Sequence, residues 1–370
     1  TKLKKKNLII TKDIDLTYCE HDKRFLPDRF VKGTCPKCGA QDQYGDQCEH
    51  CGTIYQPTDL KNPHCVICGN KPTVKKSKHY FFKLNTFSDQ LREWLTSNKN
   101  LQKEIVNQLL TWIDTGLQDW CVSRDAPYFG FKIPGEQDKY YYVWLDAPIG
   151  YISSLTYALG RDVDKGLARW NDSDIIHIIG KDIIYFHYLF WPAVLWGAGL
   201  NVPHTILTHG HLMVNGEKMS KSRGTFLTAR EFLRLVNPEH VRFYYASNLS
   251  RQMSDLNFDV KDYEAKVNNE LVANISNFTY RTLSFCNTKL DSKLTTVCDK
   301  SQCAKWSAAS KDILDTYGKH ELREAIKKIL ALSQEGNGYM QTKQPWKQDA
   351  TDASETITLL ANLVKHLAIV

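Results

Sequence analysis

The sequence feature that most constrains the fold is a pair of Cys-x-x-Cys turns near the N-terminus. Cys35 and Cys38 form one turn, Cys48 and Cys51 form the next, and nine residues separate the two turns. Each turn directs two thiolates toward one point, so two such turns can close a tetrahedron around a zinc ion. Four protein ligands leave no open coordination position, which indicates a structural zinc rather than a catalytic one. We therefore predict a small zinc-stabilised module over residues 10–75, where apolar runs are few.

A second metal site is less completely specified. Cys65 and Cys68 form a third Cys-x-x-Cys turn, but upstream of the first turn only Cys19 is present. One interpretation is a second zinc held by these three cysteines and completed by His21 or Asp22. The other interpretation is a degenerate turn that holds no metal, and the sequence leaves both open.

Length and charge set broad limits on function. The chain has 370 residues, enough for two or three domains, and its 48 Lys and Arg against 41 Asp and Glu give a net charge of +7. This mild excess is compatible with an anionic partner such as a nucleic acid. No apolar run approaches the roughly 20 residues that a membrane span needs, and Leu8-Ile9-Ile10 is too short for the core of a signal peptide. We expect a cytoplasmic protein without a membrane partner, whose cysteines are metal ligands and thiols rather than disulfides.

The middle of the chain alternates between strand and helix patterns. Apolar residues recur at intervals of three and four from Leu91 to Ile113, which predicts helices. Beyond them, strands are expected at 141–145, 175–179 and 205–208, with a helix at 185–196 between the last two. The second strand is expected to be buried. This rhythm is typical of a parallel sheet, and it predicts part of a Rossmann-like nucleotide-binding fold.

The C-terminal third is helical in pattern. Thr228 and Glu231 form a capping box that opens one helix, and Asn237-Pro238 opens the next. Four further helical segments follow, and we predict that they form an α-helix bundle, at about 263–288, 302–318, 319–335 and 353–370.

A lysine-rich pentapeptide carries the clearest chemical signal. It runs from Lys218 through Met219, Ser220 and Lys221 to Ser222, and glycines flank it on both sides. Two ammonium groups on flexible side chains can close on the phosphates of a leaving pyrophosphate as negative charge develops there. A lone lysine pair is more often a solvated surface, but the complete pentapeptide, placed after a strand and before a capped helix, favours nucleotide chemistry.

Together these segments resemble the methionyl-tRNA synthetases, a family of class I aminoacyl-tRNA synthetases, over nearly the whole chain. That resemblance implies an α/β fold with four parts: a zinc-binding connective domain over 1–121, the second half of the Rossmann-like catalytic domain over 122–216, the Lys218–Ser222 loop and a stem-contact region over 217–262, and an anticodon-binding helix bundle over 263–370. The His-Ile-Gly-His signature of the family is absent from these residues. We therefore expect a stretch that lacks the N-terminal half of the catalytic fold, is truncated at its C-terminus, and is inactive alone.

The resemblance implies a reaction and its residues. The enzyme would activate L-methionine with Mg2+ and ATP to methionyl-adenylate and transfer it to tRNA(Met), including the initiator tRNA. Lys221, assisted by Lys218, would stabilise the transition state, and ATP would also be bound by Asp182, His209 and Gly210. The methionine side chain would be selected by shape and by soft contact of its sulfur with aromatic groups, from the residues Trp144, Ala147, Pro148, Tyr151, Ile183, His187 and Trp191.

The resemblance also implies recognition of the tRNA anticodon. Asn277 and Arg281 lie four residues apart on a predicted helix, following Asn274 in one polar stripe, and Pro345-Trp346 begins a later segment. Amides and guanidinium groups can pair with splayed RNA bases, and an indole can stack on one. A homodimer through an absent C-terminal extension is a further expectation. The alternatives are a class I synthetase for another aliphatic substrate, and a non-catalytic tRNA-binding fragment or paralogue.

Overall fold

The computed structural model describes residues 2–370 except 47, 49, 52, 54, 215, 219–227 and 297–298, and the side chains of Glu217 and Lys218 are not described. The chain forms two compact units. Unit 1 comprises Thr1–His177 and Ile183–Ile206, and unit 2 comprises Ile178–Asp182 and Leu207–Val370. Among the described residues, no helix is both long and apolar enough to cross a membrane.

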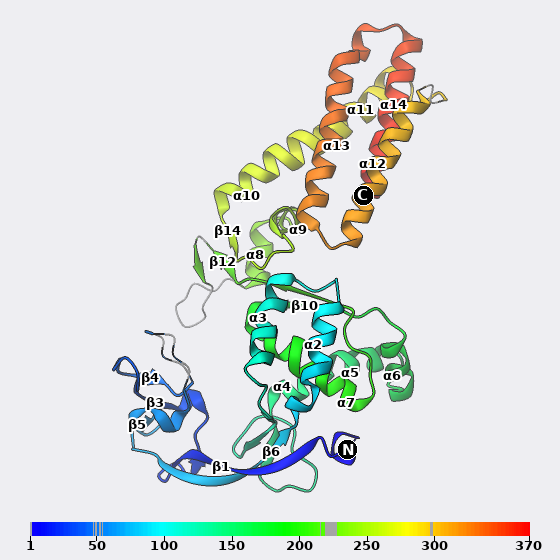
Figure 1. Cartoon of the computed structure of the whole chain (residues 1–370). Helices are drawn as coiled ribbons and strands as arrows, with labels where there is room; N and C mark the ends of the chain where they lie inside the picture. The colour runs from blue at the N-terminus through cyan, green and yellow to red at the C-terminus, as the bar shows by residue number, and fades with distance from the viewer. Residues whose placement is uncertain are drawn as a thin grey trace. The chain divides into compact units, whose positions relative to one another are not determined.

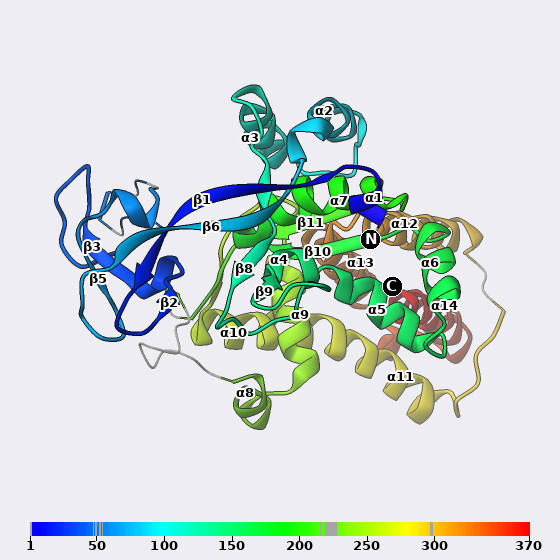
Figure 2. The ribbon, with the colours of Figure 1, turned by 90° about the horizontal axis from the view of Figure 1, so that it is seen from below.

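A long antiparallel ribbon organises the N-terminal part of unit 1. After a short helix α1 (Lys2–Lys5), strand β1 (Ile9–Cys19) pairs with β6 (Thr73–Phe82), and their register runs from Ile9 opposite Phe82 to Tyr18 opposite Thr73. Strands β2 (Arg24–Phe25) and β7 (Trp120–Cys121) extend this sheet in the order β2-β1-β6-β7. The ribbon leads to a small module at its far end (Figure 2).

The small module contains the cysteine turns. Strands β3 (Val31–Thr34), β4 (Gln43–Tyr44) and β5 (Lys61–Cys65) form its sheet, in the order β4-β3-β5. Half of its buried core residues are cysteines, as expected for a module with few apolar residues; the core comprises Cys19, Leu26, Val31, Cys35, Cys48, Tyr55, Leu60 and Cys65.

Helices α2 (Ser88–Ser97) and α3 (Lys103–Asp114) confirm the helical periodicity from Leu91 to Ile113. The strand expected at 141–145 is wrong: β9 (Lys139–Tyr141), which pairs with β8 (Ser123–Asp125), ends at Tyr141, and helix α4 (Val143–Asp146) follows. In the helical turn, the Ala147 N–H donates to the Val143 carbonyl at 2.8 Å. The turn therefore satisfies its own backbone polar groups without needing a partner strand.

Two strands and a helical segment follow helices α5 (Ile149–Ala158) and α6 (Val163–Asn171). Strands β10 (Ile176–Gly180) and β11 (Thr205–His209) pair with each other. Between them lie a 3-10 turn η4 (Lys181–Ile183), a π-helix η5 (Phe186–Phe190) and α7 (Trp191–Ala198). The strand at 176–180 exists, but it is only partly buried: His177 and Ile179 are buried, whereas Ile178 is 71% exposed.

Unit 2 begins around a three-stranded sheet. Strand β12 (Leu212–Val214) pairs antiparallel with β13 (Glu217–Lys218) and parallel with β14 (Leu256–Phe258). The capping box of Thr228 and Glu231 opens α8 (Ala229–Leu235), as predicted. Asn237 caps α9 (Pro238–Asn248), also as predicted.

The C-terminal bundle is confirmed. One continuous helical stretch comprises α10 (Val260–Lys266), the π-helix η6 (Val267–Ser276) and α11 (Asn277–Lys289). Helices α12 (Lys300–Gly318), α13 (Leu322–Lys343) and α14 (Ala350–Ile369) complete the bundle with α11 (Figure 1). Their shared core holds large buried side chains, among them Phe278, Trp306, Ile357 and Leu360.

Candidate active site and metal centres

The first two cysteine turns bring four thiols together. Cys35 Sγ lies 3.8 Å from Cys51 Sγ, and Cys38 Sγ lies 3.6 Å from Cys48 Sγ. All four sulfur atoms lie within 4.8 Å of one another. A tetrahedron with zinc–sulfur bonds of about 2.3 Å has sulfur–sulfur edges of about 3.8 Å, so this arrangement fits a four-thiolate zinc. Gly39 allows the backbone to close the first turn, because its φ of 76° is rarely adopted by residues with a side chain.

A second set of four ligands lies in the same module. Cys19, Asp22, Cys65 and Cys68 each place one ligand atom within 4.8 Å of the others. Asp22 Oδ2 lies 3.1 Å from Cys19 Sγ and 3.2 Å from Cys65 Sγ. The Asp22 N–H donates to Cys19 Sγ at 3.3 Å, as the Cys51 N–H donates to Cys48 Sγ at 3.4 Å in a Cys-x-x-Cys turn. Asp22 therefore occupies the place of the missing fourth cysteine.

Of the two residues that the sequence left open for this place, His21 lies outside the ligand set. Its Nδ1 lies 2.9 Å from Asp22 Oδ1, the carboxylate oxygen that faces away from the sulfurs. A histidine in this position orients a ligating carboxylate from behind.

Two of the predicted methionine-binding residues are directly paired in unit 1. Tyr151 on α5 lies with its hydroxyl oxygen 3.0 Å from Nε2 of His187 on η5. His187 Nδ1 lies 3.0 Å from the carbonyl oxygen of Ile183, a third predicted residue. Burial lowers the pKa of His187, so its ring is neutral near pH 7. Because a carbonyl oxygen only accepts, Nδ1 carries the ring proton and Nε2 accepts the proton of Tyr151.

The other predicted methionine-binding residues surround this pair less directly. Trp144 stacks on Phe186 at 4.4 Å between ring centroids. Trp191 is 3% exposed and packs edge-on against Trp170. Pro148 is buried and Ala147 is exposed.

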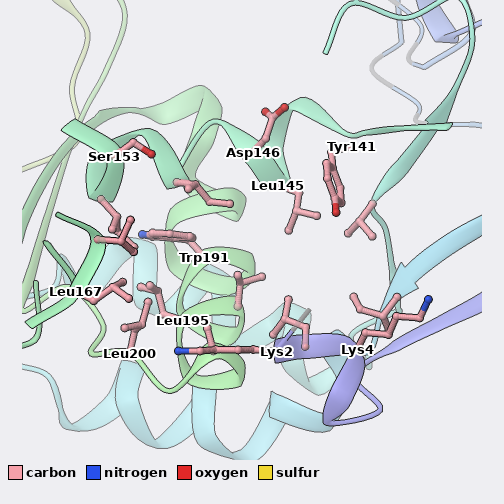
Figure 3. Close-up of a pocket in the computed structure, with 18 of the residues that line it drawn as sticks. Lys2, Lys4, Tyr141, Leu145, Asp146, Ser153, Leu167, Trp191, Leu195 and Leu200 are labelled. Carbon is pink, nitrogen blue, oxygen red and sulfur yellow. The ribbon is translucent and has the colours of Figure 1, made fainter. Parts of the chain in front are cut away.

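A cavity of about 1050 Å³ opens in unit 1 beside these residues (Figure 3). Its walls come mainly from α1, α5, α6 and α7, and they are largely apolar, with lysines from α1 at one side. Of the predicted methionine-binding residues it contacts only Trp191. The cavity is therefore distinct from the Tyr151–His187 pair.

The predicted ATP-binding residues cluster in unit 2. Asp182 is exposed at the end of β10, and its Oδ2 lies 3.3 Å from Nδ1 of His211. The backbone N–H of His211 donates to Asp255 Oδ1 at 2.7 Å, and the ammonium of Lys181 lies 2.6 Å from the same oxygen. Hydrogen bonds from Lys181 and from the His211 backbone hold the pKa of Asp255 below its ordinary value.

Gly210 is required by this packing. A Cβ atom at this position would overlap Asp255 Oδ1 and the carbonyl oxygen of Ser254. The neighbouring His209 turns its Nδ1 to the Gly210 carbonyl oxygen at 2.8 Å. Sequence reasoning missed Lys181, His211 and Asp255; the first two stand beside predicted residues, but no motif signals Asp255.

Of the lysine-rich pentapeptide, only the Lys218 backbone is described, in β13 opposite Met213. Lys221 lies outside the described residues. The catalytic roles predicted for both lysines stay predictions.

The predicted anticodon residues come together in unit 2. The Arg281 guanidinium lies 6.0 Å from the centre of the Trp346 ring, and its Nη2 donates to Gln341 Oε1 at 3.4 Å. Trp346 is 47% exposed, Pro345 is buried, and Asn277 is exposed one helical turn before Arg281.

Asn274 does not belong to this polar stripe. Its Nδ2 donates to the Leu330 carbonyl at 3.0 Å, and its Oδ1 accepts from Asn337 at 3.2 Å. Asn274 therefore holds η6 against α13 instead of facing a ligand.

Comparisons with known proteins identify the class. The family model described as tRNA synthetases class I (M) matches residues 1–283. The fold is similar to that of a Mycobacterium tuberculosis methionyl-tRNA synthetase in complex with methionyl-adenylate, with a TM-score of 0.76 and 23% identity over 100% of this chain and 69% of that one. Its free form gives a TM-score of 0.74 and 21% identity, again over 100% and 69%. The fold is thus that of a class I synthetase.

Relatives found by sequence identify the family more specifically than the fold does. A methionine–tRNA ligase of Myxococcus xanthus is 45% identical over 383 aligned positions, which cover 98% of this chain and 54% of that protein. One of Leptospira biflexa is 45% identical over 372 positions, covering 99% and 54%. The chain belongs to the methionine-type class I tRNA synthetases. It spans about half the length of these curated relatives.

Proposed function

We propose that this chain forms part of a methionine–tRNA ligase, which activates L-methionine with Mg2+ and ATP to methionyl-adenylate and esterifies tRNA(Met), including the initiator. The observation that carries the proposal is 45% identity to two such ligases over 98–99% of the chain.

The methionine side chain binds, in this proposal, against the Tyr151–His187 pair. A thioether carries no charge and only weak acceptor capacity, so a pocket must select it by shape and polarisable contacts. Trp144, Ile183 and Trp191 supply the apolar walls, and Ala147 and Pro148 border the site. The hydrogen bond between Tyr151 and His187 supports this assignment, because it fixes two aromatic rings against each other.

ATP binds on the unit 2 cluster. Asp182 is 67% exposed in its side chain and stands at the carboxyl end of β10, where open α/β sheets bind ribose hydroxyls. Gly210 and His209 lie at the end of β11, close to the adenine and phosphates. Magnesium enters with ATP and offsets the charge of the phosphates.

The reaction is an in-line attack of the methionine carboxylate on the α-phosphate. Positioning and charge stabilisation lower its barrier, and no general base is needed. Lys221, assisted by Lys218, neutralises the charge that develops on the leaving pyrophosphate. Lys221→Ala should therefore lower the rate of adenylate formation more than the affinity for ATP, whereas Lys261→Ala on the exposed side of α10 should change neither.

Both cysteine clusters hold structural zinc in this proposal. Cys35, Cys38, Cys48 and Cys51 bind the first ion, and Cys19, Cys65 and Cys68 with Asp22 bind the second. Each site has four protein ligands, so neither has a position for substrate. Their role is to stabilise a module whose core is otherwise small.

The helix bundle reads the anticodon. Asn277 and Arg281 pair with exposed bases, and Trp346, placed by the buried Pro345, stacks on one. The alternative is a non-catalytic tRNA-binding protein, which would keep this surface and lack the reaction.

Methionine-dependent exchange of pyrophosphate into ATP tests the proposal. The assay is run on this chain and on an N-terminally extended product of the same gene. Exchange in the extended product alone would support both the reaction and our expectation that this chain is inactive by itself. Exchange in neither would make the tRNA-binding alternative the leading function, and exchange in the chain itself would refute its expected inactivity.

A further inference from the structure

Two asparagine side chains link the helix of the proposed anticodon residues to its neighbour in the bundle. Asn274 lies in the last turn of η6, and Asn337 lies in α13. The side-chain Nδ2 of Asn337 donates to the backbone carbonyl oxygen of Asn274 and to its Oδ1, each at 3.2 Å. In return, Asn274 Nδ2 donates to the Leu330 carbonyl oxygen on α13 at 3.0 Å. The two amides therefore form hydrogen bonds in both directions across one helix–helix contact.

The surroundings of this amide pair are apolar. Phe278, one turn after Asn274, is fully buried, and its ring lies 2.5 Å from the position that a Cβ atom of Gly336 would take. Leu332 and Met340 of α13 are buried in the same core. Replacing both members of a hydrogen-bonded pair by apolar side chains of similar shape is often neutral or stabilising. Packing alone therefore does not explain two amides at this contact.

A pair of amides specifies the axial register of two helices more strictly than a pair of apolar side chains does. Apolar side chains can pack in several registers, whereas two amides bond only when each helix stands at one height against the other. A single buried asparagine fixes the register of coiled coils for this reason. This matters at η6, whose π-helical hydrogen bonds span five residues instead of four and so change the rotation with which α11 begins.

The register of this contact determines where the proposed anticodon residues stand. Arg281 follows Asn274 by seven residues on the same helical stretch. Its Nη2 donates to Oε1 of Gln341, one turn after Asn337 on α13, at 3.4 Å. The Arg281 guanidinium also lies 6.0 Å from the ring centre of Trp346. Each residue of axial slip would displace the guanidinium by about 1.5 Å along α13, enough to break a hydrogen bond that is already long.

We infer that Asn274 and Asn337 are positioning residues of the proposed anticodon site, whose hydrogen bonds hold η6 and α11 in the register that brings Arg281 to Trp346. They act through these two residues and need no contact with RNA. The pair contributes to recognition rather than to the stability of the bundle. The inference rests on the proposed function, since it presumes that Arg281 and Trp346 bind the anticodon.

The test replaces both amides in one double variant, Asn274→Leu with Asn337→Leu, in the chain and in its N-terminally extended gene product. We expect the double variant to resist denaturant at least as well as the unsubstituted protein, because neither amide is left without its partner. Its affinity for tRNA(Met) should fall at least about fivefold, the lower end of what one stacked base contributes. Its preference over the same tRNA with an altered anticodon should fall as well. Asn337→Leu alone should be less stable than the double variant, since it leaves the Asn274 side-chain oxygen unpaired.

Thr358→Val is the matched control. Thr358 is 4% exposed on α14, and its hydroxyl oxygen accepts from the Thr295 backbone N–H at 3.0 Å. This variant removes a buried polar contact from the same bundle, so it should be less stable but should keep the tRNA affinity of the unsubstituted protein. An equal loss of affinity in Thr358→Val and in the leucine double variant would assign the effect to general loosening of the bundle and overturn the inference.

A second readout tests whether the amide pair acts through Arg281. In an Arg281→Ala background, the two leucine substitutions should reduce tRNA affinity by a smaller factor, since one contact that they displace is already absent. An undiminished loss in that background, an unchanged affinity in the leucine double variant, or a double variant that does not fold would overturn the positioning role and leave the anticodon site standing. An unsubstituted extended protein that binds both tRNAs equally would instead refute the anticodon site itself.

Discussion

The hydroxyl group of Tyr151 donates a hydrogen bond of 3.0 Å to Nε2 of His187. His187 is 1% exposed, so this lone pair has no access to solvent. The direction of the bond follows from the other side of the ring, where the Ile183 carbonyl oxygen accepts the only ring proton. Two consecutive hydrogen bonds, from Tyr151 to His187 and from His187 to the Ile183 carbonyl in η4, therefore fix the orientation of both rings.

Tyr151→Phe should remove the hydrogen bond to His187 while keeping the aromatic ring. It leaves a buried acceptor on His187 unsatisfied, so we expect the free energy of unfolding to fall by about 1–2 kcal/mol. Methionine binding should weaken while ATP binding does not. Urea denaturation and equilibrium binding measure the two effects. Tyr157→Phe, on the more exposed side of the same helix, is the control, and equal effects in both variants would argue against the role of this hydrogen bond.

Much of the fold follows from local patterns. Helices α12 and α14 of the bundle begin after the capping side chains of Asp299 and Asp349, and they continue through apolar residues spaced at three and four. The cysteine turns are equally local, because a Cys-x-x-Cys spacing determines which two thiols converge. Each of these features needs only a few neighbouring residues, so the sequence was sufficient to predict it.

Features that depend on distant partners or irregular backbone were not predictable. The sequence predicts a regular helix at 185–196, but residues 186–190 form a π-helix, in which the Trp191 N–H donates to the Phe186 carbonyl five residues earlier. Because the wider turn changes the direction of later side chains, Trp191 packs on Trp170. Asn274 likewise turns inward to a carbonyl on α13, and no local pattern indicates this partner.

The ligand set of the second metal site predicts a substitution that should make zinc binding tighter. Asp22→Cys would complete a four-thiolate set, and thiolate is a softer ligand that zinc holds more tightly than a carboxylate in such turns. We expect the unsubstituted protein to bind two zinc ions and to release one of them first to a chelator. Asp22→Cys should retain both for longer, and Asp22→Ala should purify with one.

Elemental analysis combined with a colorimetric chelator measures this difference. Asp42→Ala is the matched control, since Asp42 belongs to the same module and its recorded side-chain contact is a surface ion pair with Lys32. A single zinc per chain in both the unsubstituted protein and Asp22→Cys would refute the second site.

A buried ion pair in unit 1 should make stability depend on pH. His79 Nε2 lies 2.9 Å from Asp125 Oδ2, the two side chains are 3% and 10% exposed, and Lys139 donates to the other carboxylate oxygen. Burial alone would lower the pKa of His79, but its hydrogen bond to Asp125 outweighs burial, so the pKa is raised above 6.5. Burial alone would raise the pKa of Asp125, but hydrogen bonds from His79 and Lys139 hold it below 3.8.

The sign of each contribution follows from these shifts. The stabilisation from His79 is complete below pH 6.5 and is lost as the pH rises through its raised pKa. The stabilisation from Asp125 is complete above pH 3.8 and is lost as the pH falls through its lowered pKa. The pair is therefore fully formed between about pH 4 and pH 6.5.

Asp125→Asn should reveal this contribution. Removing one partner of a buried pair costs about 3 kcal/mol, so the free energy of unfolding should fall most between pH 4 and 6.5 and the difference from the unsubstituted protein should shrink above that window. Denaturant melts at several pH values measure the difference. Asp138→Asn, which removes an exposed carboxylate one residue before Lys139, should give a small difference that is constant with pH; a constant difference for Asp125→Asn as well would contradict the assignment.

The contact between Arg281 and Trp346 leads to a prediction about the tRNA binding that we propose for the helix bundle. The guanidinium lies 6.0 Å from the indole centre, and the indole is about half exposed, so both groups can meet an unstacked base. Trp346→Ala should weaken tRNA(Met) binding by about tenfold, since stacking on an aromatic side chain contributes ~1–3 kcal/mol per base. Trp346→Phe should retain part of that affinity. Filter binding measures each variant at one fixed salt concentration.

The variant Arg281→Ala tests whether Arg281 recognises a base or contributes only positive charge to tRNA binding. It should weaken binding to tRNA(Met) more than to a tRNA with another anticodon, because a guanidinium that pairs with a base discriminates between bases, whereas a phosphate contact does not. Lys289→Ala removes the same charge from the last turn of the same helix, and it should weaken binding to both tRNAs equally. If Arg281→Ala also weakened both equally, Arg281 would be a phosphate contact and the anticodon would have to be read by other residues, with Asn277 the first to test.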